Sequence, residues 1–158
     1  MTSGAGAHPG TGILAGLSAK HCARLMDLAH EVTRPGAVRL FEEDENAERF
    51  WIIRTGVVAL DIQIPGRGRA VVETIGPGSL LGWSWLCPPR RWHLGAETTS
   101  PISAWEFDAI EVREVCAAHP EFGLALVTLV AETIGHRLRA TRTRLLDLYG
   151  PQGSEPRP

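Results

Sequence analysis

Residues 82–93, with the sequence GWSWLCPPRRWH, gather the side chains best suited to binding a small molecule. An apolar or aromatic group can stack on an indole ring, and Arg91 and His93 can serve as polar anchors beside it. The candidate binding residues are Gly82, Trp83, Ser84, Trp85, Arg90, Arg91, Trp92 and His93. The composition of this segment favours ligand binding over catalysis.

Patterns typical of catalytic or metal sites are absent from the sequence. It contains no P-loop, no GxGxxG motif and no recognisable Ser/His/Asp arrangement. The acidic run at residues 42–45 lacks the spacing of an EF-hand loop and is interpreted as a solvated turn. The histidines do not cluster, and no CxxC or HxxxH pair is present. We therefore expect no catalytic residue and no metal ligand.

Composition and length indicate one small globular domain. The chain has 158 residues and a formal net charge of −2, which gives no electrostatic reason to expect nucleic-acid binding. Cys22, Cys87 and Cys116 lie far apart, which argues against disulfides and for a reducing, cytoplasmic location. Neither a signal peptide nor a membrane-spanning segment is predicted. Residues 1–12 and 150–158 are predicted to be disordered tails around a domain at 13–149.

The residue pattern predicts a mainly β domain with flanking helices. Apolar residues at helical spacing predict a helix over residues 13–32, with Ser18 as its N-cap. Short β-branched and aromatic runs then predict strands at 38–41, 50–54, 57–64, 70–75, 97–100 and 102–107. The runs at 57–64 and 70–75 form the clearest hairpin, and the regular spacing favours an antiparallel sandwich or barrel.

Two helices are expected to complete the domain. Asp108 can cap a short helix that ends at His119, and a long helix is predicted from about 121 to 149. On the long helix, apolar residues repeat at alternating spacings of 3 and 4, a heptad pattern typical of helix pairing. This dimer seam comprises Leu124, Val127, Ala131, Ile134, Leu138, Thr141, Leu145 and Leu148. Leu126 and Val130 fall off the seam and are expected to face the β domain, so the helix can contact both.

The order of these elements and three motifs resemble the cyclic-nucleotide-binding domain, the effector domain of the catabolite activator family. Residues 40–58 are similar to its second strand, acidic turn and third strand, with Asp44 where a turn glycine is usual and Gly56 at the matching glycine. Residues 75–82, IGPGSLLG, are similar to the entry into its phosphate-binding cassette. The opening helix is also similar, at Leu17-Ser18. The resemblance implies an antiparallel β-roll, also called a jelly roll, between an N-terminal and a long C-terminal helix.

The cassette departs from the family pattern at the residue after Gly82. The family has a glutamate there, which accepts a hydrogen bond from the ribose 2′-hydroxyl, whereas this chain has Trp83. An indole can only donate. The resemblance implies that Arg90 or Arg91, with Arg91 nearer the expected place, binds the phosphate beside the backbone amides of Gly82 and Ser84. Three interpretations remain open: cyclic AMP or cyclic GMP binds, another small ligand binds, or tryptophans fill a ligand-free pocket.

Together these features predict a stand-alone sensor domain. In the catabolite activator family a helix-turn-helix domain follows, but only residues 150–158 remain here, so direct DNA binding is not expected. We expect a homodimer or an unknown protein partner to carry the output. The alternatives are a structural or protein-interaction module with a filled pocket and a metal-dependent barrel enzyme.

Overall fold

The computed structural model describes residues 12–150. Two antiparallel sheets of four strands form a β-roll, with strand orders β1-β8-β3-β6 and β2-β7-β4-β5. The first sheet contains β1 (His30–Arg34), β8 (Ile102–Asp108), β3 (Arg49–Thr55) and β6 (Leu80–Leu81). The second contains β2 (Arg39–Phe41), β7 (Gly95–Thr98), β4 (Val58–Ile64) and β5 (Gly68–Ile75). The predicted fold class is confirmed.

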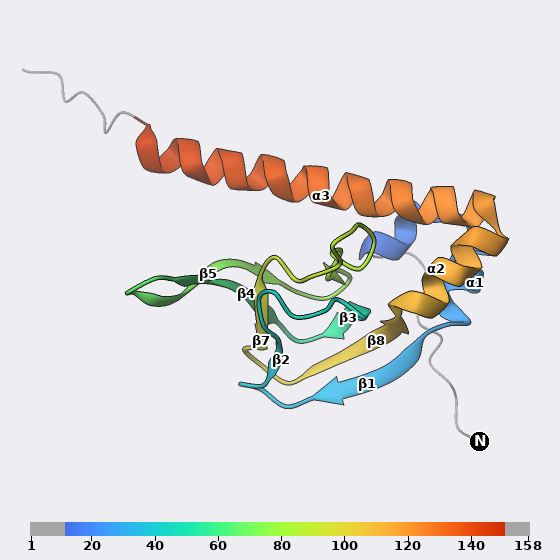
Figure 1. Cartoon of the computed structure of the whole chain (residues 1–158), viewed down its shortest axis with the longest axis horizontal. Helices are drawn as coiled ribbons and strands as arrows, with labels where there is room; N and C mark the ends of the chain where they lie inside the picture. Colours follow the sequence, from blue (N-terminus) through green and yellow to red (C-terminus); the bar gives the residue numbers. More distant parts are fainter. Residues whose placement is uncertain (1–11, 151–158) are drawn as a thin grey trace, which may run out of the picture.

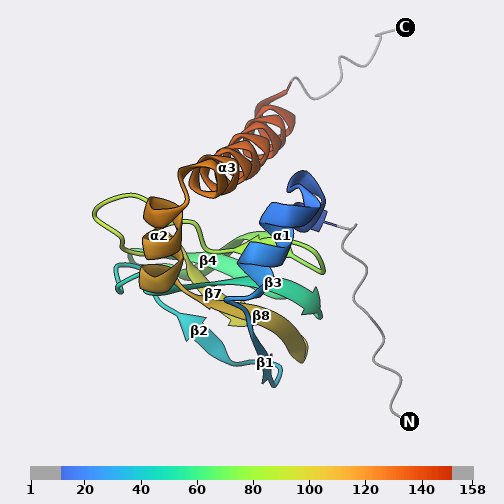
Figure 2. The same cartoon turned by 90° about the vertical axis from the view of Figure 1, so that its right-hand side faces the viewer.

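Helices flank the β-roll at one end and along one side. A 3-10 helix η1 (Gly12–Gly16) and helix α1 (Ala19–Met26) precede it, and α2 (Ala109–Ala118) and α3 (Pro120–Tyr149) follow. Helix α3 runs along one side of the β-roll toward the β4–β5 hairpin, while α1 and α2 lie at the end where α3 begins (Figures 1 and 2). Apart from Gly12 and Gly150, the predicted tails lie outside the described residues.

The predicted helix over residues 13–32 is wrong after Asp27, and its first residues form the separate 3-10 helix η1. Ser18 does cap a helix, since its hydroxyl accepts a hydrogen bond from His21 N at 3.2 Å. That helix ends at Asp27, however, and the following residues form β1, which pairs with β8 from His30 to Arg34. The β-branched Val32 and Thr33 suit a strand, and the edge of β8 supplies the backbone partners. The two-residue strand β6 was also not predicted.

The remaining elements follow the sequence closely. Strands β4 and β5 form the predicted hairpin, paired from Val58 with Ile75 to Ile64 with Gly68. The Asp108 carboxylate caps α2 by accepting hydrogen bonds from Ile110 N at 2.8 Å and Glu111 N at 3.0 Å. Asp44 has the left-handed backbone, with φ of 65°, expected of a residue in the place of a turn glycine.

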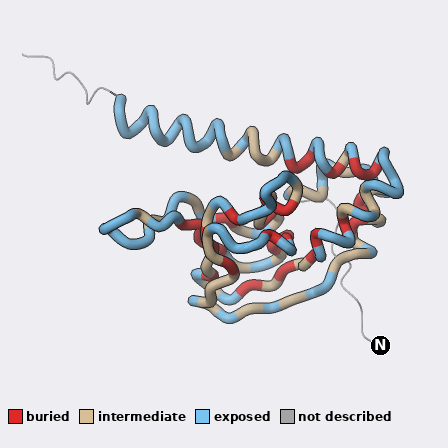
Figure 3. Tube along the Cα trace, viewed as in Figure 1, coloured by how far each residue is buried: buried red, intermediate tan, exposed pale blue. Residues whose placement is uncertain are grey.

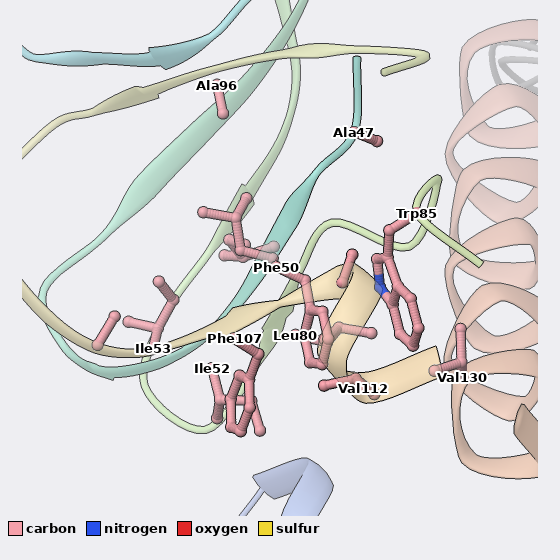
Figure 4. Close-up of a cluster of buried hydrophobic side chains, with 14 of the residues drawn as sticks. Ala47, Phe50, Ile52, Ile53, Leu80, Trp85, Ala96, Phe107, Val112 and Val130 are labelled. Carbon is pink, nitrogen blue, oxygen red and sulfur yellow. The ribbon is translucent and has the colours of Figure 1, made fainter. Parts of the chain in front are cut away.

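An aromatic stack fills the core between the β-roll and the helices. Phe50 lies 4.4 Å from Trp85 and 4.7 Å from Phe107 between ring centroids. Trp85 occupies the space between Phe50 and Val130 of α3, close to Val112 of α2 (Figure 4). Buried residues of α3 lie in its first part, and the distal part is exposed (Figure 3). The core therefore attaches α3 firmly only near its beginning.

Gly56 is predicted to be more sensitive to substitution than another glycine with similar backbone geometry. Its φ is +87°, and a Cβ there would lie 2.2 Å from the carbonyl oxygen of Pro101. Gly66 has a φ of +75°, but a Cβ there would meet nothing within 4 Å. Gly56→Ala should lower the free energy of unfolding by about 2–4 kcal/mol, and Gly66→Ala by about 1–2 kcal/mol. Urea unfolding checks this, and equal losses would contradict it.

Candidate functional site

A cavity of about 60 Å³ lies where the 82–94 segment, the β-roll and α3 meet. Phe41 of β2 and Leu60 of β4 supply its β-roll side, and Arg137 supplies its α3 side. The rest of the lining is Gly82, Trp83, Ser84, Trp92, His93 and Leu94. Five of the eight candidate binding residues therefore surround one cavity.

Gly82 and Trp92 form one wall of the cavity, where the indole of Trp92 occupies the space that a side chain at residue 82 would need. Gly82 has a φ of +90°, and a Cβ there would lie 2.6 Å from Cζ3 of Trp92. The indole of Trp92 stacks on Phe41 with ring centroids 4.0 Å apart, and the residue is 5% exposed. The Trp92 main chain pairs with the acidic turn, through Asp44 N to Trp92 O and Trp92 N to Glu45 O. Gly82 thus allows the indole to fill the interior beside it.

The rim of the cavity consists of a stacked pair and a buried hydroxyl. Trp83 stacks on His93 with ring centroids 4.7 Å apart and an interplanar angle of 23°. The buried Ser84 hydroxyl is 3.1 Å from Nδ1 of the same imidazole. His93 itself is exposed and Trp83 is half-buried. This pair offers a flat surface next to a polar group, as aromatic ligands require.

Arg137, which was not among the predicted binding residues, places a positively charged side chain at the cavity. Its guanidinium donates a hydrogen bond to the carbonyl oxygen of Leu80, and its Nε lies 3.8 Å from the Glu73 carboxylate. Burial lowers the pKa of this guanidinium, and the nearby Glu73 partly opposes the effect. The sequence contained a signal: Arg137 follows Val130 by seven residues, and Val130 was expected to face the β-roll.

The other three candidate binding residues lie away from the cavity lining. Arg90 and Arg91 are exposed, and the Arg91 guanidinium donates to the carbonyl oxygen of Asp44 at 2.8 Å. Trp85 is fully buried in the core, and its indole N–H has no hydrogen-bond partner. Its carbonyl oxygen accepts from Arg113 at 2.7 Å, and burial lowers the pKa of Arg113. The structure therefore separates these residues from the cavity.

The predicted dimer seam faces away from the β-roll over most of its length. Leu126 and Val130 point into the core as expected, at 3% and 1% exposure. Ile134 is half-buried, and the other seam residues, Leu124, Val127, Ala131, Leu138, Thr141, Leu145 and Leu148, are exposed. The exposed apolar row agrees with the heptad pattern and leaves one face of α3 available for a partner.

Within residues 12–150, no group of three or more His, Cys, Asp or Glu side chains is placed to hold a metal ion. In the same part of the chain, no helix is both long enough and apolar enough to span a bilayer.

Comparisons with known proteins agree with the fold. The family model of the cyclic nucleotide-binding domain matches residues 33–119. Over 137 residues the chain is 27% identical to a CRP-like cAMP-activated global transcriptional regulator of Mycobacterium tuberculosis, covering 87% of this chain and 59% of that protein. The chain thus spans about three fifths of this relative.

Solved structures show the same fold. A cyclic nucleotide-binding domain from Methylobacillus flagellatus superposes with a TM-score of 0.76 at 17% identity, over 89% of this chain and 78% of that one. The N-terminal domain of a transcriptional regulator from Streptomyces coelicolor gives a TM-score of 0.66 at 24% identity, over 90% and 95%. Since the family model spans more than half of the sequence, this chain belongs to the cyclic nucleotide-binding domain family.

Proposed function

We propose that this chain is a ligand-sensing regulatory module that binds a small anionic molecule between the 82–94 segment and Arg137. The supporting observation is that Arg137 belongs to α3 and also lines the cavity of the cassette. A ligand that binds this guanidinium would therefore act directly on the helix that carries the signal. We propose no catalytic role for the site, because its polar side chains suit binding, in keeping with the regulatory character of the family.

The proposed signal is a change in how the distal part of α3 is held. Arg137 donates to Leu80 O next to β6, and Arg144 donates to Val72 O on β5 at 2.7 Å. These two contacts attach the exposed distal part of α3 to the β-roll. An anion that takes the Arg137 guanidinium from Leu80 would remove one of them. Ligand binding and helix release would then be two sides of one equilibrium.

The cassette is proposed to be a modified form of the family site. Trp83 follows Gly82 where a ribose-binding glutamate is expected, and its ring stacks on His93. An indole cannot accept a hydrogen bond from a ribose hydroxyl. We also propose that the anion anchor is Arg137, since Arg91 is engaged by the acidic turn. The geometry thus favours a ligand-binding role with altered chemistry over a ligand-free structural module.

The output is proposed to pass through α3 to another protein chain. The exposed seam suits a parallel homodimer, with a different protein partner as the alternative. The relative from Mycobacterium tuberculosis is a transcriptional regulator, but its match includes 59% of its length, and we propose no direct DNA binding for residues 12–150. We propose a cytoplasmic location, which suits the three free cysteines.

Thermal unfolding of the purified protein tests this function. It is measured without ligand and with cyclic AMP, cyclic GMP or organic anions that are not nucleotides. At least one compound should stabilise the chain, by about 2.7 kcal/mol at 100 times its dissociation constant. The stabilisation should disappear in Arg137→Met and persist in Arg139→Met, since Arg139 is exposed. Circular dichroism of both variants establishes that they fold. If Arg137→Met folds and retains the stabilisation, or if no compound stabilises the wild-type chain, the proposal is wrong.

Arg144→Ala is expected to loosen the distal part of α3 without ligand. The substitution removes the contact with Val72 O, while the core around Val130 still holds the start of the helix. Amide hydrogen exchange over residues 138–149 should become several-fold faster, and exchange over 120–130 should stay unchanged. Arg142→Ala is the matched control, because Arg142 is fully in the exposed part of the helix. Equal exchange in the two variants would show that Arg144 does not hold α3.

A further inference from the structure

The polar groups around the cavity are mismatched to a ligand rich in hydroxyl groups. Among the described residues, those lining the cavity include no carboxylate. The Ser84 hydroxyl is already within hydrogen-bond distance of His93, and Asp61, next to Leu60 in sequence, is held by Arg39. A sugar hydroxyl buried here would find no carboxylate acceptor, and the Ser84 hydroxyl is already engaged with His93, so its hydrogen bonding would be weaker than in a site with a glutamate. The lining therefore selects against a ribose.

The charge and shape of the lining point to a small planar anion. Arg137 contributes one guanidinium, whose planar fork suits a carboxylate. Phe41, Leu60, Trp92 and Leu94 give the cavity apolar walls. At the rim, the Trp83–His93 pair adds a flat face on which a ring can stack. One cation and flat apolar walls match a molecule with one negative charge and one aromatic ring.

The cavity is smaller than a one-ring ligand, so its rim must open for such a ligand to bind. A dry cavity of about 150 Å³ accommodates a benzene ring in another protein, and the cavity here is about 60 Å³. Outward movement of the half-buried Trp83 and the exposed His93 would enlarge it at the rim. A cyclic nucleotide, which carries a sugar, a base and a phosphate, is larger than a one-ring acid and would require a larger opening of the cavity.

From these observations we propose that the site binds compact aryl carboxylates, with the carboxylate on Arg137 and the ring against Trp83 and His93. This inference rests on the proposed function, since it names the ligand class of the same site. It replaces the ribose and phosphate recognition expected of a cyclic nucleotide with recognition of one ring and one planar charge.

Calorimetric titration of the full chain with benzoate tests the ligand class. A one-ring acid has few atoms, so the expected dissociation constant is about millimolar. Benzamide, which has the same shape without the charge, should bind at least about 10-fold more weakly, as should benzoate to Arg137→Met. Cyclohexanecarboxylate should also bind more weakly, because it cannot stack. Trp83→Leu should weaken benzoate binding, while Trp105→Leu, on the opposite sheet, serves as the control.

The outcomes separate this inference from the proposed function. If cyclic AMP or cyclic GMP binds through Arg137 and benzoate does not, the sensor function stands and the aryl carboxylate class is wrong. Equal binding of benzoate and cyclohexanecarboxylate would contradict the aromatic part of the proposal. If benzoate binds equally to wild-type protein and Arg137→Met, the assigned anchor is wrong. If neither benzoate nor a cyclic nucleotide nor another anion binds, both proposals fall.

Discussion

Asp61→Ala is expected to lower the free energy of unfolding by about 3–5 kcal/mol, because it removes two charge-assisted hydrogen bonds and leaves the half-buried Arg39 with only the Glu42 carboxylate as a partner. Arg39 donates two hydrogen bonds to the Asp61 carboxylate, at 2.5 and 2.6 Å, and Asp61 is 4% exposed. Arg39 of β2 reaches Asp61 of β4 by crossing β7 at Gly95. A Cβ on Gly95 would lie 2.0 Å from Nη2 of Arg39, so the glycine leaves room for the guanidinium. The pair thus links three strands of one sheet.

The Asp61 contribution should depend on pH. The hydrogen bond from Arg39 lowers the pKa of Asp61 below its usual value, although burial acts in the opposite direction. Stabilisation by this carboxylate is therefore complete above the unfolded-state pKa of about 4, and it is lost as the pH falls through the folded-state pKa. Urea unfolding at a series of pH values should show the difference between wild type and Asp61→Asn shrinking in acid.

A matched variant distinguishes the loss of this ion pair from the loss of any acidic side chain. Glu45→Ala removes an exposed carboxylate and should change the stability by less than about 0.5 kcal/mol. A loss below about 1 kcal/mol in Asp61→Ala would mean that the pair does not hold the sheet together. A difference between wild type and Asp61→Asn that stays constant down to the acid transition would contradict the lowered pKa.

Trp92→Ala is expected to have the second large effect, a loss of about 3–5 kcal/mol. The indole is 5% exposed and stacks on Phe41 and beside Trp51, with centroids 4.0 and 6.2 Å apart. Phe41 and Trp92 line both the candidate site and a second hollow of about 170 Å³ on the other side of the stack. Removing the ring should therefore destabilise the fold and join the two spaces.

Trp83→Ala is the natural comparison for Trp92→Ala. Trp83 is half-buried at the rim, so its loss should lower the free energy of unfolding by about 1 kcal/mol or less. Urea unfolding of both variants measures the difference. Similar losses would contradict the difference in burial between the two indoles, and a Trp92→Ala variant as stable as wild type would contradict the packing described above.

Local signals in the sequence were enough to predict most of the fold. The strand runs carry β-branched residues, and Asp108 has both the side chain and the position of a helix cap. Residues 28–32 were misassigned to a helix because Val32 and Thr33 are only two adjacent β-branched residues, and β1 depends on pairing with β8, about 70 residues away in sequence. A strand of two residues such as β6 likewise has no period to detect.

The site was predictable only in part, because its two halves are far apart in sequence. The composition of residues 82–93 placed the candidate site at the cassette, and Gly82, Trp83, Ser84, Trp92 and His93 line one cavity. Sequence spacing could not show that Arg91 would turn toward the Asp44 carbonyl. Nor could it show that α3 would bring Arg137 to the cavity, since this depends on how the helix packs across the β-roll.

Hydrogen exchange of α3 with and without bound ligand tests the central claim most directly. The measurement uses wild-type protein and Arg137→Met, each with a compound that stabilises the wild-type chain. In wild type, the ligand should accelerate exchange over residues 138–149, because Arg137 leaves Leu80 O. In Arg137→Met, exchange there should already be fast and should not respond to the compound. If the wild-type chain is saturated with ligand and exchange over residues 138–149 is unchanged, the site does not signal through α3.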